Sequence, residues 1–259
     1  MKSFTDHLGR AVKMNYPPKR IVSFAPAITD TLYSLELDTE IVGRTRFCVH
    51  PKEKVVKATN VGGTKDMKIE RIHALKPDII IVEKEENTKE MVEELEEFFP
   101  VFVFEVQTVK DALKMIVDLG NLTDRTRQAV DLEQKIIAAF RRIPTRIGKA
   151  RAAYVIWKNP YMVVGKNTYI QSLLEKLGFE NPFVKFEGRY PSVTEEDLRA
   201  AKLDYILLAT EPYPFQEKHK QEFLQISPDA NIKIVDGEMF WYGVKMVDAA
   251  KYFKEELLR

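Results

Sequence analysis

Large aromatic side chains stand in loop-like stretches of this 259-residue chain, outside its apolar runs. Glycine, proline or charged residues flank each one, so packing within a buried strand does not explain them. Flat rings with a polar tip suit a macrocycle or an aromatic-rich chelate, although each can equally be a packed loop anchor. The aromatic candidates for ligand contact are Phe47, Trp157, Tyr161, Tyr190, Tyr213, Phe215, Trp241 and Tyr242.

Cys48 and His50 form a Cys-x-His pair in the stretch "RFCVHP". A thiolate and an imidazole are both competent ligands for iron or cobalt. Two residues do not make a metal cage, however, and no spacing in the chain supplies the further ligands that zinc needs. We therefore treat Cys48 and His50 as candidate ligand contacts and His50 as the candidate metal ligand, with a hydrogen-bonded structural histidine as the alternative.

Five basic residues fall near the aromatic loops and can meet the oxyanions of a ligand, for which the planar fork of arginine is well shaped. A solvated rim of charges is the alternative interpretation for each. Arg46 is the basic residue that we select as a ligand contact. The full set is Arg44, Arg46, Lys158, Lys166 and Arg189.

Motifs of the common enzyme classes are missing from the sequence. There is no G-x-x-x-x-G-K-[ST] phosphate loop, no G-x-S-x-G elbow and no H-E-x-x-H pair. An enzyme of the chelatase kind would require His50, Glu211 and His219 to converge. We predict a binding protein without catalytic residues or an intrinsic cofactor.

The composition describes a globular chain with 45% hydrophobic and 31% charged residues. A net charge of +1 provides no field that would recruit nucleic acid or an anionic membrane. No apolar run is long enough to span a bilayer, and the single cysteine excludes an internal disulfide. The first residues, "MKSFTDHLGRAVKM", lack the apolar core of a secretion signal, so we expect either a cytoplasmic protein or one whose leader has been removed.

Strand-like and helix-like segments alternate along the chain, the pattern of a largely parallel sheet covered by helices. The fold class is therefore α/β. The expected strands lie near 20–24, 78–82, 101–104, 151–156, 204–208 and 232–235. The expected helices lie near 28–36, 69–75, 87–98, 108–118, 168–177, 194–201, 215–225 and 244–257.

One phrase occurs twice, as "ERIHALKPDIII" from Glu70 and as "EDLRAAKLDYILL" from Glu196, an offset of 126 residues. A second match, "KRIVSFAP" with "ARAAYVIW", has an offset of 131, from Arg20 to Arg151. Similar offsets indicate two α/β lobes built on one plan, with chance similarity as the alternative. We expect a ligand in a cleft between these lobes, at the carboxyl ends of their strands.

Between the two halves lies a run without internal glycine or proline, "TDRTRQAVDLEQKIIAAFRRIP". Thr123 is a plausible N-cap, and Pro144 closes the run. The apolar positions of one side are Val130, Leu132, Ile136, Ile137 and Phe140. We predict an N-terminal lobe over 1–120, a connecting helix over 121–145 that limits hinge motion, and a C-terminal lobe over 146–259.

Four phrases together resemble the substrate-binding proteins of ABC importers for cobalamin, haem and ferric siderophores. They are "KRIVSFAPAITDTLYSLEL", "IVGRTRFCVHP", "VGGTKDMKIERIHALKPDIIIV" and "YPSVTEEDLRAAKLDYILLA", and the resemblance runs from about Asp6 to the C-terminus. It is closest to the cobalamin-binding branch. That branch commonly has a tryptophan near the "VGG" loop, where this chain has Gly63-Thr64-Lys65.

The resemblance implies two Rossmann-like lobes joined by one long helix, a monomer, and a corrinoid or iron chelate as the ligand. It places Phe47, Tyr190 and Trp241 at or close to ligand-contact positions. Glu70 and Glu196 match the exposed glutamates that dock onto arginines of the transporter's membrane subunits; ordinary first-turn glutamates are the alternative. An exported protein would be periplasmic or on the cell surface. A cytoplasmic carrier or sensor without a transporter is the second possibility.

Overall fold

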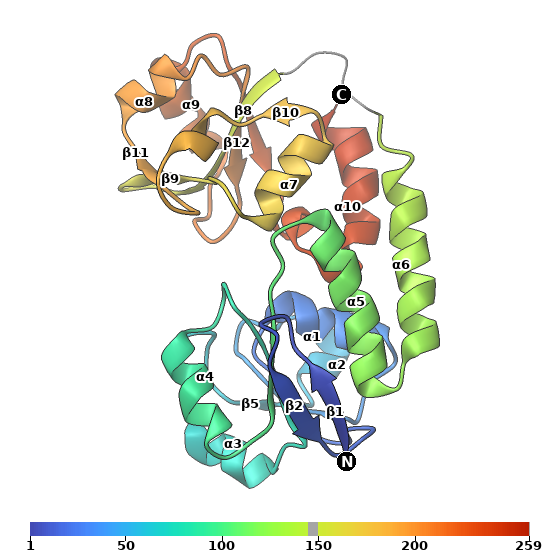
Figure 1. The fold of residues 1–259 in the computed structure, drawn as a ribbon. Coiled ribbons are helices and arrows are strands. Elements are labelled where there is room, and N and C mark those ends of the chain that lie inside the picture. Colours follow the sequence, from blue (N-terminus) through green and yellow to red (C-terminus); the bar gives the residue numbers. More distant parts are fainter. Residues whose placement is uncertain (145–149, 259) are drawn as a thin grey trace. The chain divides into compact units, whose positions relative to one another are not determined.

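The computed structural model describes residues 1–144 and 150–258. The chain divides into two compact units (Figure 1), called the first and the second unit below. The first comprises Met1–Val106 and Lys110–Lys135, and the second comprises Gln107–Val109 and Ile136–Arg259. Each unit contains a sheet with helices around it, which confirms the α/β class.

The sheet of the first unit has the strand order β5-β4-β3-β6-β7, and every neighbouring pair is parallel. The strands are β3 (Ile21–Ser23), β4 (Ile41–Arg44), β5 (Thr59–Asn60), β6 (Ile79–Glu83) and β7 (Val101–Phe104). All residues of β3, β6 and β7 are buried, as expected for parallel strands covered on both faces. The three predicted strands of this half are confirmed, and β4 and β5 are additional.

Helices of the first unit are α1 (Pro26–Ser34), α2 (Lys52–Val55), α3 (Ile69–Leu75), α4 (Lys89–Glu96) and most of α5 (Val109–Thr123). Ile72 of α3 and Leu95 of α4 pack in one core cluster with Ile80 of β6. Their apolar stripes therefore cover one face of this sheet. The sequence analysis missed the antiparallel hairpin of β1 (Lys2–Thr5) and β2 (Ala11–Met14).

The sheet of the second unit has the order β11-β9-β8-β12-β13, and β10 also pairs with β8. Strands β8, β12 and β13 are parallel, whereas β9 is antiparallel to β8 and to β11. The strands are β8 (Ala150–Trp157), β9 (Tyr161–Val163), β10 (Phe179–Glu180), β11 (Ser192–Val193), β12 (Tyr205–Ala209) and β13 (Asn231–Val235). All three predicted strands of this half are confirmed.

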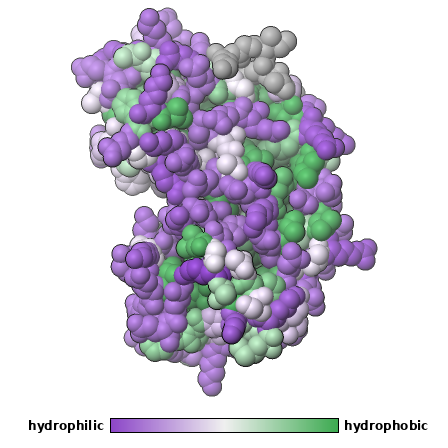
Figure 2. Space-filling model, viewed as in Figure 1, coloured by the Kyte–Doolittle hydropathy of each residue, from purple (hydrophilic) through white to green (hydrophobic). Residues whose placement is uncertain are grey.

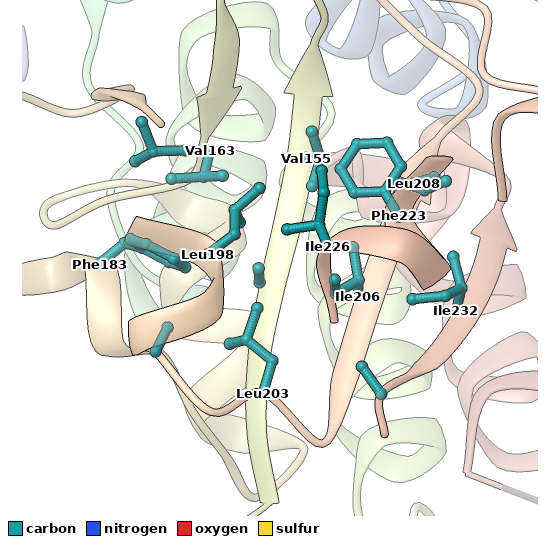
Figure 3. Close-up of a cluster of buried hydrophobic side chains, with 14 of the residues drawn as sticks. Val155, Val163, Phe183, Leu198, Leu203, Ile206, Leu208, Phe223, Ile226 and Ile232 are labelled. Carbon is teal, nitrogen blue, oxygen red and sulfur yellow. The ribbon is translucent and has the colours of Figure 1, made fainter. Parts of the chain in front are cut away.

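Helices of the second unit are α7 (Tyr169–Lys176), α8 (Glu195–Ala200), α9 (Glu217–Ile226) and α10 (Met246–Tyr252). Short turns are η1 (Pro182–Lys185), η2 (Gly237–Phe240), η3 (Gly243–Lys245) and the π-turn η4 (Phe253–Leu257). Figure 3 shows Leu198 of α8, Phe223 of α9 and Ile206 of β12 among the side chains of one buried cluster. These helices are amphipathic and cover the sheet with their apolar sides.

The repeated phrase has a structural explanation in both units. Asp78 begins the approach to β6 and accepts hydrogen bonds from the backbone N–H groups of Lys19 and Arg20, at 2.8 and 3.0 Å. Asp204 does the same before β12, accepting from the N–H of Arg151 at 2.6 Å. In each unit this aspartate ties the start of one central strand to the start of its neighbour.

A helix, α6 (Thr126–Phe140), lies where the connecting helix was expected over 121–145; position 145 is outside the described residues. Thr123 is not its N-cap. It ends α5, where its hydroxyl donates to the carbonyl of Leu119 at 2.6 Å. Val130 is 40% exposed, and Ala129 is buried beside it. Residues of α6 belong to both units, and its connecting role remains a prediction.

Candidate functional site

A loop of the first unit follows β4 and carries Arg46 and Phe47. Both terminal nitrogens of Arg46 donate to the carboxylate of Asp66, each at 2.8 Å. The guanidinium lies 4.8 Å from the ring centre of Phe47, and that ring is 48% exposed. Since the arginine is held in a bidentate pair, it positions an exposed ring at the edge where the parallel strands end, called the C-terminal edge below.

Cys48 lies inside the protein, with 2% of its surface exposed. Its sulfur is 3.1 Å from the hydroxyl of Thr29 and 3.2 Å from that of Thr45. Burial raises the pKa of the thiol, which favours the uncharged form. His50 is half-buried. Within the described residues no group of three or more His, Cys, Asp or Glu side chains is arranged to hold a metal ion.

Four predicted aromatic residues of the second unit are linked by ring contacts, that of Tyr161 through Phe223, and are called the aromatic cluster: Trp157, Tyr161, Tyr213 and Phe215. Trp157 ends β8 and packs edge-on against Tyr213, with ring centres 5.6 Å apart. Tyr213 contacts Phe215 at 4.6 Å. Trp157 is 40% exposed, Tyr161 and Tyr213 are half-buried, and Phe215 is buried. Phe215 is therefore the buried member, on which Tyr213 packs.

Glu222 of α9 anchors the aromatic cluster from its polar side. Its carboxylate accepts hydrogen bonds from the hydroxyl of Tyr161 and the ammonium group of Lys158. Burial alone would raise the pKa of Glu222, but these two donors outweigh it and lower that pKa. Lys158 is therefore paired with a charged carboxylate at this site.

Trp241 and Tyr242 make a second set of contacts in the second unit. The indole N–H of Trp241 donates to the carboxylate of Glu211. A side chain at Gly237 would lie 2.3 Å from Glu211, so only glycine permits this approach. Tyr242 is buried, and its ring packs edge-on against Tyr169 with centres 5.7 Å apart. The predicted pocket residues of this unit thus form two groups.

The remaining candidates are dispersed. Tyr190 and Arg189 are half-buried, and Lys166 is exposed. Arg44 donates to the carbonyls of Val55 at 3.2 Å and Thr45 at 3.1 Å, and so holds its own loop.

His219 packs against the rings of Tyr213 and Phe215, at 5.6 and 5.5 Å. Its Nδ1 accepts a hydrogen bond from the backbone N–H of Gln216 at 2.9 Å. These contacts cap the start of α9. They give His219 a structural role, and Glu211 is instead bonded to Trp241.

Glu70 and Glu196 are the second residues of α3 and α8. Both are exposed, and neither carboxylate has a hydrogen-bond or ion-pair partner among the described residues. The N-terminal position favours a negative charge through the helix dipole. The fold explains the repeated aspartates, but it gives no structural reason for the repeated glutamates.

Sequence reasoning missed Asp66, Glu222 and Tyr169. Asp66 and Glu222 are acidic residues without a motif, and only the fold brings them to Arg46 and Lys158. The sequence does mark the position of Tyr169 as the start of a helix, because Thr168 before it is a typical N-cap residue. The hydroxyl of Thr168 caps α7 by accepting from the N–H of Gln171 at 3.1 Å.

The face in Figure 2 is mostly hydrophilic, with its hydrophobic residues in separate areas. No helix in the described part of the chain has the length and apolar character needed to cross a membrane.

Comparison with known proteins gave one family and several relatives. The model of a family described as "Periplasmic binding protein" matches residues 21–232. The vitamin B12-binding protein of Vibrio parahaemolyticus is 27% identical over 191 residues, covering 71% of this chain and 68% of its own length.

Two solved structures from Vibrio cholerae share the fold. The periplasmic vitamin B12 binding protein BtuF has a TM-score of 0.78 at 19% identity, covering 91% of this chain and 94% of its own. The periplasmic heme binding protein HutB has a TM-score of 0.75 at 19% identity, covering 93% of this chain and 99% of its own.

Proposed function

Because this chain belongs to the periplasmic binding protein family, we propose that it binds a metal chelate and delivers it to an ABC importer. The ligand is a corrinoid, haem or a ferric siderophore, and the protein binds it without chemical change. Relatives named for vitamin B12 and heme binding support this ligand class. The protein then acts outside the cytoplasmic membrane.

The observation that carries the proposal is the aromatic cluster at the C-terminal edge of the second unit, where β8 and β12 end. Trp157 and Tyr213 present ring surface there and pack against each other, Tyr213 also packs on the buried Phe215, and Glu222 holds the hydroxyl of Tyr161. Preorganised rings bind a flat ligand at low entropic cost. The exposed ring of Phe47 stands at the corresponding edge of the first unit.

The ligand contacts that we propose are the accessible members of the predicted set: Phe47, Trp157, Tyr161, Tyr190, Tyr213 and Trp241. Arg46 acts by holding Phe47. Cys48 is buried and lies within hydrogen-bond distance of Thr29 and Thr45, and the rings of Phe215 and Tyr242 are buried against other rings; we assign these three residues to the support of the loops. His50 is half-buried, and its role as a single ligand to the metal of the chelate stays a prediction.

Delivery to a transporter needs exposed groups that the fold itself does not use. Glu70 and Glu196 satisfy this condition in the two units, and we propose that they meet basic residues of two membrane subunits. Charge pairs at such contacts set orientation and association rate more than affinity.

Titration of the purified protein tests the binding proposal. The panel contains cyanocobalamin, its cobinamide precursor, haemin and ferric siderophores, followed by visible absorption and tryptophan fluorescence. We expect one class of ligand to saturate the protein and to quench the fluorescence of the exposed Trp157. No binding by any member would reject the proposed function.

A pair of matched variants locates the ligand. Phe47 and Phe98 are 48% and 54% exposed, but Phe98 precedes β7 and so lies at the opposite edge of the same sheet. Phe47→Ala should weaken binding by about tenfold or more, as expected for a central ring of an interface. Phe98→Ala should leave the affinity unchanged. Equal effects would show that the ligand does not lie against Phe47.

A further inference from the structure

Tyr169 is the first residue of α7, a helix capped by Thr168. The loop before it returns from β9, where the N–H of Val164 donates to the carbonyl of Tyr154 at 2.9 Å. After α7 the chain enters β10, which pairs with the start of β8. The first turn of α7 therefore lies toward the edge where β8 ends, which is the edge of the aromatic cluster.

The side chain of Tyr169 is 5% exposed, and its hydroxyl has no hydrogen-bond partner among the described residues. Its ring packs edge-on against Tyr242, 5.7 Å away, and Tyr242 follows directly after the predicted ligand contact Trp241. Proteins leave few buried hydroxyls unpaired, because each one loses its hydrogen bonds to water on folding. Phenylalanine would fill the same space equally well if packing were the only role of this side chain.

The surroundings of the hydroxyl determine the kind of partner that fits. Burial raises the pKa of Tyr169, so the phenol keeps its proton and acts as a donor. The first turn of α7 carries no acidic side chain, and its backbone N–H groups give that end a partial positive charge. An oxygen acceptor is therefore favoured there over a donor or a cation.

We propose that the hydroxyl of Tyr169 donates a hydrogen bond to an oxygen acceptor at the periphery of the bound chelate. That acceptor is an amide carbonyl, as in the side chains of a corrinoid, or a carboxylate, as in haem. The tyrosine thus recognises the substituents of the ligand and leaves its metal to other groups. This inference rests on the proposed function and names one contact within it.

The test is Tyr169→Phe, which removes one oxygen and keeps the ring against Tyr242. The matched control is Tyr252→Phe, in the same unit, whose hydroxyl accepts from the N–H of Asp236 at 3.2 Å. Thermal unfolding of the free proteins and titration with cyanocobalamin and haemin give two independent readouts. Cyanocobalamin offers amide carbonyls and haemin offers carboxylates, so the ligand whose affinity falls identifies the acceptor.

We expect Tyr169→Phe to weaken binding of the ligand that wild type accepts by about tenfold, the effect of one lost hydrogen bond in a dry site. Its ligand-free Tm should be equal to or above that of wild type, since no internal bond is lost. Tyr252→Phe should show the reverse: a lower Tm and an unchanged affinity.

Two results would overturn the inference while the proposed function stands. One is wild-type affinity of Tyr169→Phe for the ligand. The other is a fall in ligand-free Tm as large as that of Tyr252→Phe, which would mean that the hydroxyl is already paired within the protein. If wild type binds no member of the panel, the proposed function fails, and this inference fails with it.

Discussion

Glu83, the last residue of β6, is a carboxyl group buried at the C-terminal edge of the first unit, with 1% of its surface exposed. It accepts hydrogen bonds from the backbone N–H groups of Glu85, Glu86 and Val106, at 2.7, 3.2 and 3.2 Å. Burial is the largest influence and raises its pKa to about 7. One side chain thus joins two loops near the candidate site.

The raised pKa predicts a pH dependence of stability. In the unfolded chain Glu83 titrates near its ordinary value, so between that value and about 7 the folded state holds the extra proton. The contribution is complete below the unfolded pKa, is lost as the pH rises through about 7, and amounts to about 3 kcal/mol. Urea unfolding from pH 4 to 8 measures it.

Glu83→Gln should remove this part of the profile, because an amide does not titrate. The difference between wild type and variant is the quantity to follow, since other groups titrate in both proteins. Glu90→Gln, an exposed position on α4, should keep the wild-type profile. A Glu83→Gln profile parallel to that of wild type would contradict the pKa assignment.

Residue types predicted the candidate site only in part. Aromatic residues beside glycine, proline or charged residues led to Trp157, Tyr161 and Tyr213; Trp157 packs on Tyr213, and Tyr161 and Tyr213 pack against the same buried core. The same argument selected Phe215, and the Cys-x-His spacing selected Cys48; both are buried. Spacing along a loop does not tell which side chains point inward, because that depends on contacts with distant segments, such as Thr29 against Cys48.

The repeated helix-to-strand segment contains a second shared feature at the scale of elements. Lys76 follows α3 with a φ of 45°, and Lys202 follows α8 with a φ of 46°. This left-handed conformation crowds the Cβ atom against the backbone, and glycine adopts it freely. The repeat therefore preserves a turn geometry as well as a sequence.

Lys76→Gly and Lys202→Gly should each stabilise the protein by about 0.5–1 kcal/mol, since glycine relieves the left-handed strain. Thermal or urea unfolding measures the change. Lys76→Ala and Lys202→Ala are the controls, because alanine keeps the Cβ atom and removes the rest of the side chain with its charge. Equal gains from glycine and alanine would assign the effect to loss of the lysine side chain and not to relief of the left-handed strain.

Prediction of elements succeeded where the apolar signal was strong. The run Ile79–Val82 and the phrase around Ile206 identified β6 and β12 to within two residues. The hairpin of β1 and β2 was missed, although Val12 and Met14 alternate with exposed residues. Strands of two to four residues, such as β5 and β11, carry too few side chains for a period to be recognised.

At the scale of the whole molecule, the two units share the arrangement of their central strands and differ in the strands at the edges of their sheets. Both place a helix, an aspartate and a central strand in the same order, with β6 beside β3 and β12 beside β8. The second unit adds the antiparallel strands β9 and β11, and with them the turn that carries Trp157 and Tyr161. The shared arrangement thus accounts for the scaffold of both units, and the added strands account for the aromatic cluster.

The proposed docking residues give a prediction that needs both units. Glu70→Ala and Glu196→Ala should each reduce uptake, or capture by the reconstituted transporter, and leave ligand affinity unchanged. Since the two glutamates lie in different units and share no partner, the loss in the double variant should be the product of the single losses. The effect should shrink as salt rises, as for exposed charge pairs.

A double variant with the same charge change provides the control. Glu53→Ala/Asp229→Ala also removes one exposed carboxylate from each unit, and it should transport like wild type. If it fails as badly as Glu70→Ala/Glu196→Ala, net charge governs association and the two helix positions are not special. If the Glu70 and Glu196 variants lose ligand affinity instead, these residues act on binding, and the docking role is wrong.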